Sequence, residues 1–223
     1  MPQQSLIKGL ALLSLSALLF ATMGVLIRLA SHTVDNTIVV FMRNLTGTLL
    51  LTPFILSQGK DFLVTHKPWM HLWRALVGLA AMYGFFYAIA HLPLSNAMVF
   101  TYSSPVFIPL VAWLFLKERI TPLMLLAAFV GLIGVGLVAK PDVGMFNWLS
   151  LVGISSSFLA AMAFVTVRAL AATEPATRTV FYFCLIATFV SAIPMCWHWR
   201  ILTLQELYYL VGAGTLATIS QIS

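Results

Sequence analysis

Long apolar runs separated by short polar segments dominate this chain of 223 residues. A run of roughly 17–25 apolar residues is needed to cross the ~30 Å hydrocarbon layer of a membrane as a helix. Seven such runs are present, and an eighth begins near Leu207 and is still apolar at Ser223. We therefore expect an all-α protein, a polytopic transmembrane helix bundle. The seven runs cover residues 10–30, 37–56, 72–90, 96–116, 122–139, 148–171 and 179–197.

The first run also resembles the apolar part of a secretory signal peptide, because it follows Lys8. It is about 20 residues long, ends at Arg28, and has no small-x-small cleavage site before the next run. We expect it to be retained as the first transmembrane helix.

The chain repeats itself with a period of 140 residues. Shifted by this period, about a third of the ungapped stretch 16–48 is identical to the stretch 156–188. Self-similarity over a long fixed period indicates a repeated structural unit. The identical positions in the first copy are Ser16, Leu19, Ala21, Val25, Arg28, Thr33, Thr37, Val40, Phe41, Leu45 and Thr48.

The repeat predicts two structural units, residues 1–140 and residues 141–223. The first unit holds five runs, and an odd number of membrane crossings inverts the second unit relative to the first. Inverted repeats are typical of secondary transporters, in which the substrate site lies near the membrane midplane. Such a period predicts roughly 280 residues and about ten helices, of which about eight are present. We therefore expect the second unit to be truncated within its third helix.

The composition supports a membrane protein. Hydrophobic residues make up 61% of the chain, charged residues 8%, and the mean hydropathy is +1.00, whereas about a quarter of the residues of a soluble domain are charged. A net charge of +6 would favour nucleic-acid partners in a soluble chain, but here the cations lie at the ends of runs. The expected partners are the lipid bilayer and a small-molecule substrate, with no nucleic acid.

The distribution of cations between loops predicts the orientation. If the N-terminus is cytoplasmic, eight cations lie inside and three outside, which satisfies the positive-inside rule. The eight are Lys8, Lys60, Lys67, Arg74, Lys117, Arg119, Arg168 and Arg178.

Arg43 is the strongest candidate for a functional residue, because it lies about two turns inside the second run. A cation at that depth costs at least ~2.5 kcal/mol unless it is paired or hydrated. All six acidic residues lie in loops or at the ends of runs, so none is an evident partner. Two interpretations stay open. Arg43 faces a wet cavity and binds an anionic or zwitterionic substrate group, or it snorkels outward or caps carbonyls of a broken helix.

The fourth run contains two prolines, Pro105 and Pro109, which we expect to kink the helix. Each removes a helical N–H and frees the carbonyl four residues earlier, that of Thr101 in the case of Pro105. Broken backbone at membrane depth occurs only inside protein or beside water, so this segment is a candidate lining of the substrate site; a plain packing kink is the alternative. The candidate lining residues are Thr101, Tyr102, Ser103 and Ser104.

Tyr83 and Tyr87 share one face of the third run, because they are separated by four residues. Substrate contact is the functional interpretation and aromatic packing the structural one. The serine triplet at 155–157 favours tight helix packing, with substrate hydrogen bonding as the alternative.

Several motifs are absent from the sequence. There is no Walker loop, so an ATP-driven pump is not indicated. There is also no HExxH, no GxSxG and no intramembrane aspartate pair. We therefore expect no catalytic residues, no cofactor and no metal site.

Taken in order, these segments resemble the EamA family of the drug/metabolite transporter superfamily. The similar segments are ALLFATMGVLIRLA, FMRN, WRALVGLAAMYGFFYAIAHLPLSNA, the run with Pro105, LKERIT and GLIGVGLVAKP. Each motif is weak alone, but their order and spacing make the resemblance strong over essentially the whole chain. The segment HKPWMHLWRALVGLAAMYGFFYAIAHLPLSNAMVF also resembles the branch with bacterial S-adenosylmethionine uptake carriers.

The resemblance implies a basket of ten helices, formed by two inverted five-helix units around a central cavity. Proteins of this kind move small metabolites across a bacterial inner membrane. The first run lacks the membrane-embedded glutamate of the small multidrug-resistance relatives and has Thr22 and Met23 in its middle. Proton-coupled export of cationic drugs by that mechanism is therefore not expected.

We expect a secondary, non-ATP transporter that carries a small polar metabolite across the bacterial inner membrane by alternating access. The metabolite would bear a carboxylate and be amino-acid-like or nucleoside-like. Arg43 would hold its anionic group, and the tyrosines and serines named above would complete the site. The alternatives are a truncated, non-transporting membrane protein and an intramembrane enzyme. The sequence leaves open the substrate, the direction of transport, the coupling ion and whether the protein forms a homodimer.

Overall fold

The computed structural model describes residues 2–117, 121–139 and 148–222, and every regular element in these ranges is helical. The expected all-α class is therefore confirmed. Residues 118–120 of the LKERIT segment and the predicted boundary between the repeat units at residue 140 lie outside the described ranges. The elements are α1 (Pro2–Ala30), α2 (Asn36–Ser57), η1 (Lys60–Leu63), α3 (Pro68–His91), α4 (Leu94–Tyr102), α5 (Ser104–Leu116), α6 (Pro122–Ala139), α7 (Trp148–Ala171), α8 (Ala176–His198) and α9 (Leu204–Ile222).

Six helical stretches within the described ranges are long and apolar enough to cross a membrane. The fourth of them is formed by α4 and α5 together, and the described apolar part of α6, Pro122–Gly134, is shorter. These stretches agree with the apolar runs of the sequence to within a few residues at each end, so the chain is a multi-pass membrane protein. The six stretches are Gly9–Ala30, Asn36–Ser57, Pro68–His91, Leu94–Leu116, Leu151–Ala171 and Ala176–His198.

The chain divides into two compact units. Unit 1 contains Met1–His66 and Pro175–Ser223, and unit 2 contains Lys67–Glu174. This spatial division differs from the sequence repeat, because each unit combines helices from both copies. The two repeat units, 1–140 and 141–223, remain a prediction from the sequence.

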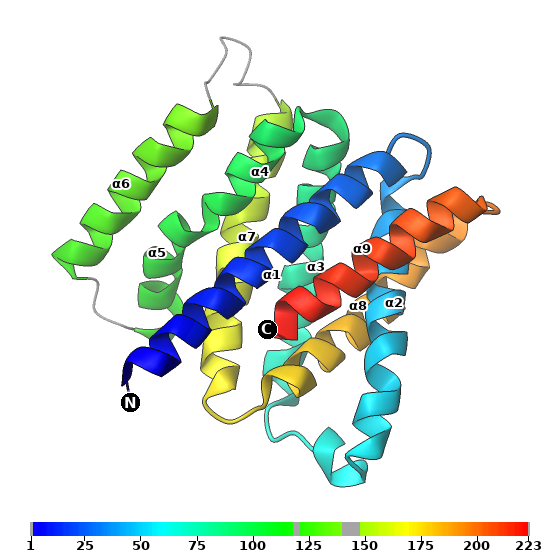
Figure 1. Ribbon diagram of the computed structural model, residues 1–223, viewed down its shortest axis with the longest axis horizontal. Helices are drawn as coiled ribbons and strands as arrows, with labels where there is room; N and C mark the ends of the chain where they lie inside the picture. The colour runs from blue at the N-terminus through cyan, green and yellow to red at the C-terminus, as the bar shows by residue number, and fades with distance from the viewer. Residues whose placement is uncertain (1, 118–120, 140–147, 223) are drawn as a thin grey trace. The chain divides into compact units, whose positions relative to one another are not determined.

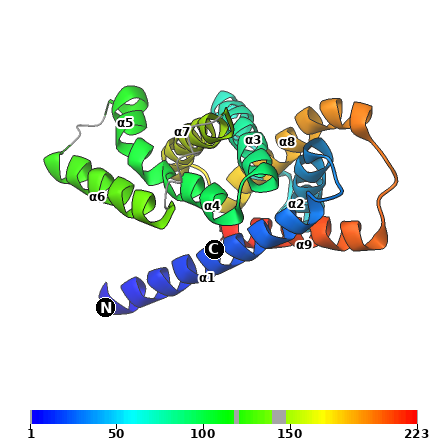
Figure 2. The same cartoon turned by 90° about the horizontal axis from the view of Figure 1, so that it is seen from above.

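Unit 1 has two layers. The helices α1 and α9 lie side by side in one layer, and α2 crosses α8 in the other (Figure 1). Figure 2 shows the two layers from above, and α9 packs against α2 to join them. The helices α1 and α9 run in opposite directions. Ser16 in the first half of α1 lies 2.9 Å from Ser220 near the end of α9 (Oγ to Oγ), whereas Thr33, just after the end of α1, bonds to Glu206 near the start of α9.

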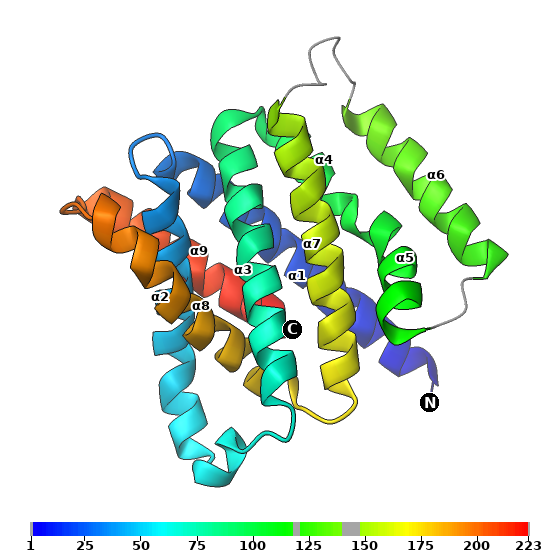
Figure 3. The ribbon, with the colours of Figure 1, turned by 180° about the vertical axis from the view of Figure 1, so that it is seen from behind.

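Unit 2 is centred on α3 and α7, which lie side by side (Figure 3). Ser156 Oγ of α7 donates to the carbonyl oxygen of Ala81 in α3 at 2.7 Å. The helices α4 and α5 also pack on α7, and α6 lies against both of them. Hydrophobic packing holds α5 against α7, since Val111 of α5 is buried in one cluster with Ala161 and Val165 of α7.

Two helices start at positions that are 140 residues apart. The helix α2 begins at Asn36 and α8 begins at Ala176, which are equivalent positions in the 140-residue repeat. The residues before them have the same extended conformation: φ −62° and ψ 144° at Asp35, φ −65° and ψ 147° at Pro175. The two residues start the helix differently, because the Asp35 side chain accepts a hydrogen bond from the N–H of Thr37 whereas the φ of proline is fixed by its ring. Equivalent segments therefore fold alike despite different chemistry.

Candidate binding site around Arg43

Arg43 is enclosed where α2 crosses α8. Its side chain is 2% exposed, so it does not snorkel to the membrane surface. Its Nη1 donates to Asn44 Oδ1 at 2.9 Å and to Cys184 Sγ at 3.7 Å. The guanidinium carbon lies 5.6 Å from the centroid of the Phe183 ring, within the range of a cation–π contact. Asn44 is itself oriented, since its Nδ2 donates to the carbonyl oxygen of Val40 at 2.8 Å.

The opposite edge of the Arg43 guanidinium, formed by Nε and Nη2, has no hydrogen-bond or ion-pair partner among the described residues. A buried cation without a counter-charge is unfavourable. The planar N–H fork of arginine matches the two oxygens of a carboxylate. This arrangement can therefore accept one carboxylate in a bidentate geometry.

The residues of α8 that face Arg43 and Asn44 are their equivalents in the second copy of the repeat. Residues 43 and 44 correspond to residues 183 and 184, so Arg43 and Asn44 face Phe183 and Cys184. Only the first copy carries a charge at this crossing. Hydropathy alone does not pair Arg43 with α8, although the repeat offset points to these two positions.

Two glycines bring the neighbouring helices close to Arg43. A Cβ atom on Gly47 of α2 would lie 2.8 Å from Cys184 Sγ. A Cβ atom on Gly214 of α9 would lie 2.6 Å from Thr46 Cβ and 3.0 Å from the carbonyl oxygen of Arg43. Small residues permit such close approach of membrane helices. The contacts of α2 with α8 and with α9 therefore depend on these glycines.

The fourth run breaks at Ser103, two residues before Pro105. Helix α4 ends one residue before Ser103 and α5 begins one residue after it. The N–H of Ser103 is shared between the carbonyl oxygens of Val99 and Phe100, at 3.0 and 3.1 Å. Its hydroxyl donates to the same Val99 oxygen at 2.9 Å. The expected break is present, and Ser103 uses its own hydroxyl within it.

The other candidates in this segment differ in their surroundings. Ser104 is buried, and Pro105 is exposed at the start of α5. Pro109 lies inside α5 without ending it. The side chains of Thr101 and Tyr102 lie outside the described residues.

The carbonyl of Phe100, at this break, accepts a hydrogen bond from another helix. Ser157 Oγ of α7 donates to it and also lies 3.0 Å from the carbonyl oxygen of Gly153. The Phe100 ring covers Gly153, where a Cβ atom would come within 2.5 Å of the ring. Ser155, by contrast, is exposed. Pro105 predicts a freed carbonyl at Thr101, but the contact of the Phe100 carbonyl with α7 is not predictable from the proline alone.

Tyr83 and Tyr87 are partly buried, one turn apart on α3. The Tyr87 ring stacks on His91, with 4.1 Å between ring centroids. Both tyrosines belong to unit 2 with Ser103 and Ser104, whereas Arg43 belongs to unit 1. Their contact with a substrate remains a prediction.

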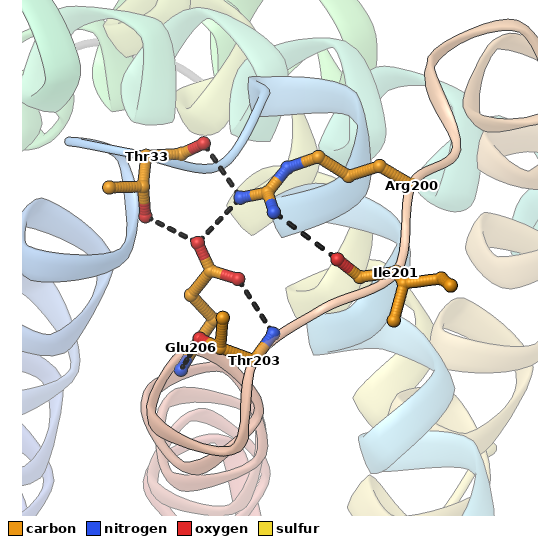
Figure 4. A network of polar contacts seen from close by, with 5 residues as sticks. All are labelled: Thr33, Arg200, Ile201, Thr203 and Glu206. Carbon is orange, nitrogen blue, oxygen red and sulfur yellow. Dashed lines mark hydrogen bonds and ion pairs between the residues drawn. The ribbon is translucent and has the colours of Figure 1, made fainter.

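A polar network that the sequence analysis missed joins the loops after α1 and α8 (Figure 4). The buried carboxylate of Glu206 accepts hydrogen bonds from Thr33 Oγ1 at 2.6 Å, Arg200 Nη2 at 2.5 Å and the N–H of Thr203 at 2.9 Å. Arg200 Nη2 also donates to the carbonyl oxygen of Thr33 at 2.8 Å. The hydrogen bonds from Arg200, Thr33 and Thr203 lower the pKa of Glu206 to about 2. Thr203 and Glu206 are spaced as a capping box before an apolar run, which is the signal that could have located this network.

A second set of contacts fastens the segment after α2 to the start of α8. Arg178 Nε donates to the carbonyl oxygen of Phe62 at 2.6 Å, and its guanidinium carbon lies 5.0 Å from the centroid of the Phe62 ring. The hydroxyl of Tyr182 donates to the carbonyl oxygen of Leu63 at 2.6 Å. Contacts of this kind therefore hold the loops at both ends of α8.

The described residues contain no group of three or more His, Cys, Asp or Glu side chains that could hold a metal ion. Neither cysteine of the described residues forms a disulfide; Cys184 is buried and Cys196 is exposed. The polar chemistry of the described site is therefore that of Arg43 and its neutral partners.

Comparison with solved structures supports the fold. A crystal structure that is 20% identical in sequence superposes with a TM-score of 0.70. The match covers 95% of this chain and 77% of the other. This likeness concerns the arrangement of the helices.

Comparison with characterised proteins finds named transporters. The chain is 33% identical to the pseudopaline exporter CntI of Pseudomonas aeruginosa over 217 residues, which is 96% of this chain and 76% of that protein. It is 27% identical to the S-adenosylmethionine uptake transporter of Rickettsia bellii, over 81% of this chain and 62% of the relative. It is 29% identical to the riboflavin transporter of Brucella anthropi, over 56% of this chain and 44% of the relative. The EamA-like transporter family itself matches residues 7–140. The chain therefore belongs to the EamA-like transporter family.

Proposed function

We propose that this protein carries a small polar metabolite with a carboxylate across the bacterial inner membrane by alternating access. The observation that carries the proposal is the buried Arg43 guanidinium, whose Nε–Nη2 edge has no partner in the described part of the chain. A bound carboxylate would supply two hydrogen bonds and the counter-charge at once. Family membership supports the broader statement, that the protein is a transporter of small metabolites.

The names of the relatives supply test substrates that differ in the group at issue. S-adenosylmethionine carries an α-carboxylate, and decarboxylated S-adenosylmethionine is the same molecule without it. Riboflavin is uncharged and has no carboxylate. We expect this protein to prefer the first of the three, because only it can bind both N–H groups of the free guanidinium edge and also compensate the charge.

Residues of unit 2 are proposed as further substrate contacts. Tyr83 and Tyr87 would stack on or hydrogen-bond the metabolite, and Ser103 and Ser104 would hydrogen-bond it. Each is tested by its own substitution, Tyr→Phe or Ser→Ala, in the same flux measurement. We also propose a cytoplasmic N-terminus, on the basis of the distribution of cations between loops.

The experiment is flux into and out of liposomes that contain the purified protein. We expect saturable flux of S-adenosylmethionine at least about tenfold above that of its decarboxylated form, because losing one charge-assisted bidentate contact costs at least ~1.5 kcal/mol. Arg43→Gln should lose at least about tenfold in flux for the same reason. Arg43→Lys should also fail to restore flux, since an ammonium lacks the planar fork.

The matched control is Arg168→Gln, which removes an exposed arginine at the end of α7. It should insert and transport as the unchanged protein does. Equal flux of the two S-adenosylmethionine forms, or unchanged flux in a correctly inserted Arg43→Gln protein, would refute the proposed role of Arg43.

A further inference from the structure

Cys184 lies in the interior of α8 with its sulfur against the guanidinium of Arg43. The residue is fully buried, and Arg43 Nη1 donates to Sγ at 3.7 Å. A thiol is a weak hydrogen-bond acceptor and, in its protonated form, carries no charge. The sulfur therefore compensates little of the charge that α2 brings to this crossing.

A second observation points to a ligand at the same place. The buried Nε of Arg43 has no hydrogen-bond partner among the residues that the structure describes, and the hydrogen bonds to Asn44 and Cys184 both use Nη1. One edge of the guanidinium is thus held by neutral groups while the other is left for an anion. An anion bound at that edge lies on the same small planar group that the thiol contacts.

The sulfur of Cys184 is closely packed against α2. A Cβ atom on Gly47 would lie 2.8 Å from Sγ and 2.8 Å from Thr218 Oγ1. The thiol therefore lies where α2, α8 and α9 meet, and a substituent on it must push α2 away or displace the Arg43 side chain. Either movement destroys the geometry that a carboxylate would use.

We propose that Cys184 is part of the substrate site, and that it is the position at which a thiol reagent inactivates the protein. The inference rests on the proposed function of Arg43. The thiol holds Nη1 when the site is empty and remains beside the guanidinium when a carboxylate is bound. Alkylation by N-ethylmaleimide adds the sulfur to one alkene carbon of the reagent and the thiol proton to the other, so no group leaves and no oxidant is needed.

The test uses the Cys196→Ala protein in liposomes, which retains only Cys184. The rate of N-ethylmaleimide addition is followed by intact mass, with no probe, with S-adenosylmethionine, or with its decarboxylated form. We expect saturating S-adenosylmethionine to slow the addition at least about fivefold and the decarboxylated form to have no effect. One adduct per chain, located at Cys184 by peptide mass, should abolish flux.

Two variants serve as controls. In the Cys184→Ala protein the remaining thiol, Cys196, is exposed near the end of α8, and S-adenosylmethionine should leave its alkylation rate unchanged. In the Arg43→Gln, Cys196→Ala protein, protection of Cys184 should disappear.

The outcomes separate the two proposals. In one outcome, the Cys196→Ala protein transports S-adenosylmethionine, but this compound does not slow the alkylation of Cys184, and alkylation does not reduce flux. That outcome would overturn the inference and leave the proposed function standing. A protein that transports none of the test compounds before alkylation would overturn the proposed function and the inference with it.

Discussion

The hydroxyl oxygens of Thr48 and Thr188 lie 3.1 Å apart, and the two threonines occupy the same position in the two copies of the 140-residue repeat. A residue that contacts its own counterpart marks the local two-fold axis on which α2 crosses α8. About one turn away, Arg43 and Asn44 face Phe183 and Cys184 across the same crossing. The copies of the repeat therefore meet at the site proposed for the anion.

The contact between these threonines can be measured as a coupling energy. Each hydroxyl also lies within hydrogen-bond distance of a carbonyl oxygen in its own helix, Thr188 of Cys184 at 2.7 Å and Thr48 of Asn44 at 3.0 Å. The bond across the crossing therefore forms when one of the two hydroxyls turns its proton from that carbonyl to the other hydroxyl. We expect Thr48→Val and Thr188→Val each to lower the free energy of unfolding by about 0.5–1 kcal/mol. The double variant should lose about 0.6 kcal/mol less than the sum of the two single losses, because the shared contact is removed only once. Unfolding in mixed micelles measures this cycle, with Thr22→Val on the exposed face of α1 as the neutral control. Strict additivity would contradict the contact.

Gly214→Ala tests the close approach of α9 to α2. The added methyl group would lie 3.0 Å from the carbonyl oxygen of Arg43, which is backbone and cannot turn aside. We expect the free energy of unfolding to fall by about 1–3 kcal/mol from overpacking. Gly131→Ala in α6, which has no neighbouring atom within 4 Å, is the matched control. It should be neutral or stabilising by up to about 1 kcal/mol, because alanine favours helix. Equal effects at both positions would contradict the packing.

Ser157→Ala tests the fastening of α7 to the break between α4 and α5. The variant leaves the carbonyl of Phe100 without its hydrogen bond from α7. We expect a loss of about 1–3 kcal/mol in the free energy of unfolding, as for a buried acceptor whose donor is removed. Ser155→Ala, two residues away and exposed, should change it by less than about 0.5 kcal/mol. A Ser157→Ala protein as stable as Ser155→Ala would show that the hydroxyl contributes nothing.

The Glu206 network predicts a loss of stability in acid. Folding lowers the pKa of Glu206 from 4.5 to about 2, because Arg200, Thr33 and Thr203 donate hydrogen bonds to its charged form. The unfolded chain therefore binds more protons between these two values. The contribution is complete above about pH 4.5 and is lost as the pH falls towards about 2.

The measurement is the difference in unfolding temperature between the unchanged protein and Glu206→Gln in detergent. This difference should be larger at about pH 6 than at about pH 3, since glutamine does not titrate. A difference independent of pH would mean that the charge of Glu206 plays no part.

The positions of the helices could be predicted because length and hydropathy determine which segments cross a membrane. Helices begin at residue 36, one position before the predicted second run, and at residue 176, three positions before the seventh. The break near Pro105 was also predictable, since proline cannot donate the helical hydrogen bond. These features depend on the local sequence alone.

Contacts between helices could not be predicted in the same way. The partners of Arg43 depend on the crossing of α2 and α8 and on one rotamer of a long side chain, and hydropathy determines neither. The hydrogen bond from Ser157 to Phe100 requires two helices to meet at a particular carbonyl. Glu206 was classed only as a residue at the end of a run, because its partners Thr33 and Arg200 lie far from one another in the sequence.

The single charge at the crossing of α2 and α8 limits how this protein could have arisen. Two identical chains related by the same two-fold axis would bring a second guanidinium to the place of Phe183, where the first already lies 5.6 Å from the ring centre. Like charges that close, in so little water, repel strongly. A duplicated gene whose halves are joined escapes this constraint, because each half can mutate separately. The present arrangement, with a cation from one copy and an aromatic ring and a thiol from the other, therefore requires the two copies to differ in sequence at these positions.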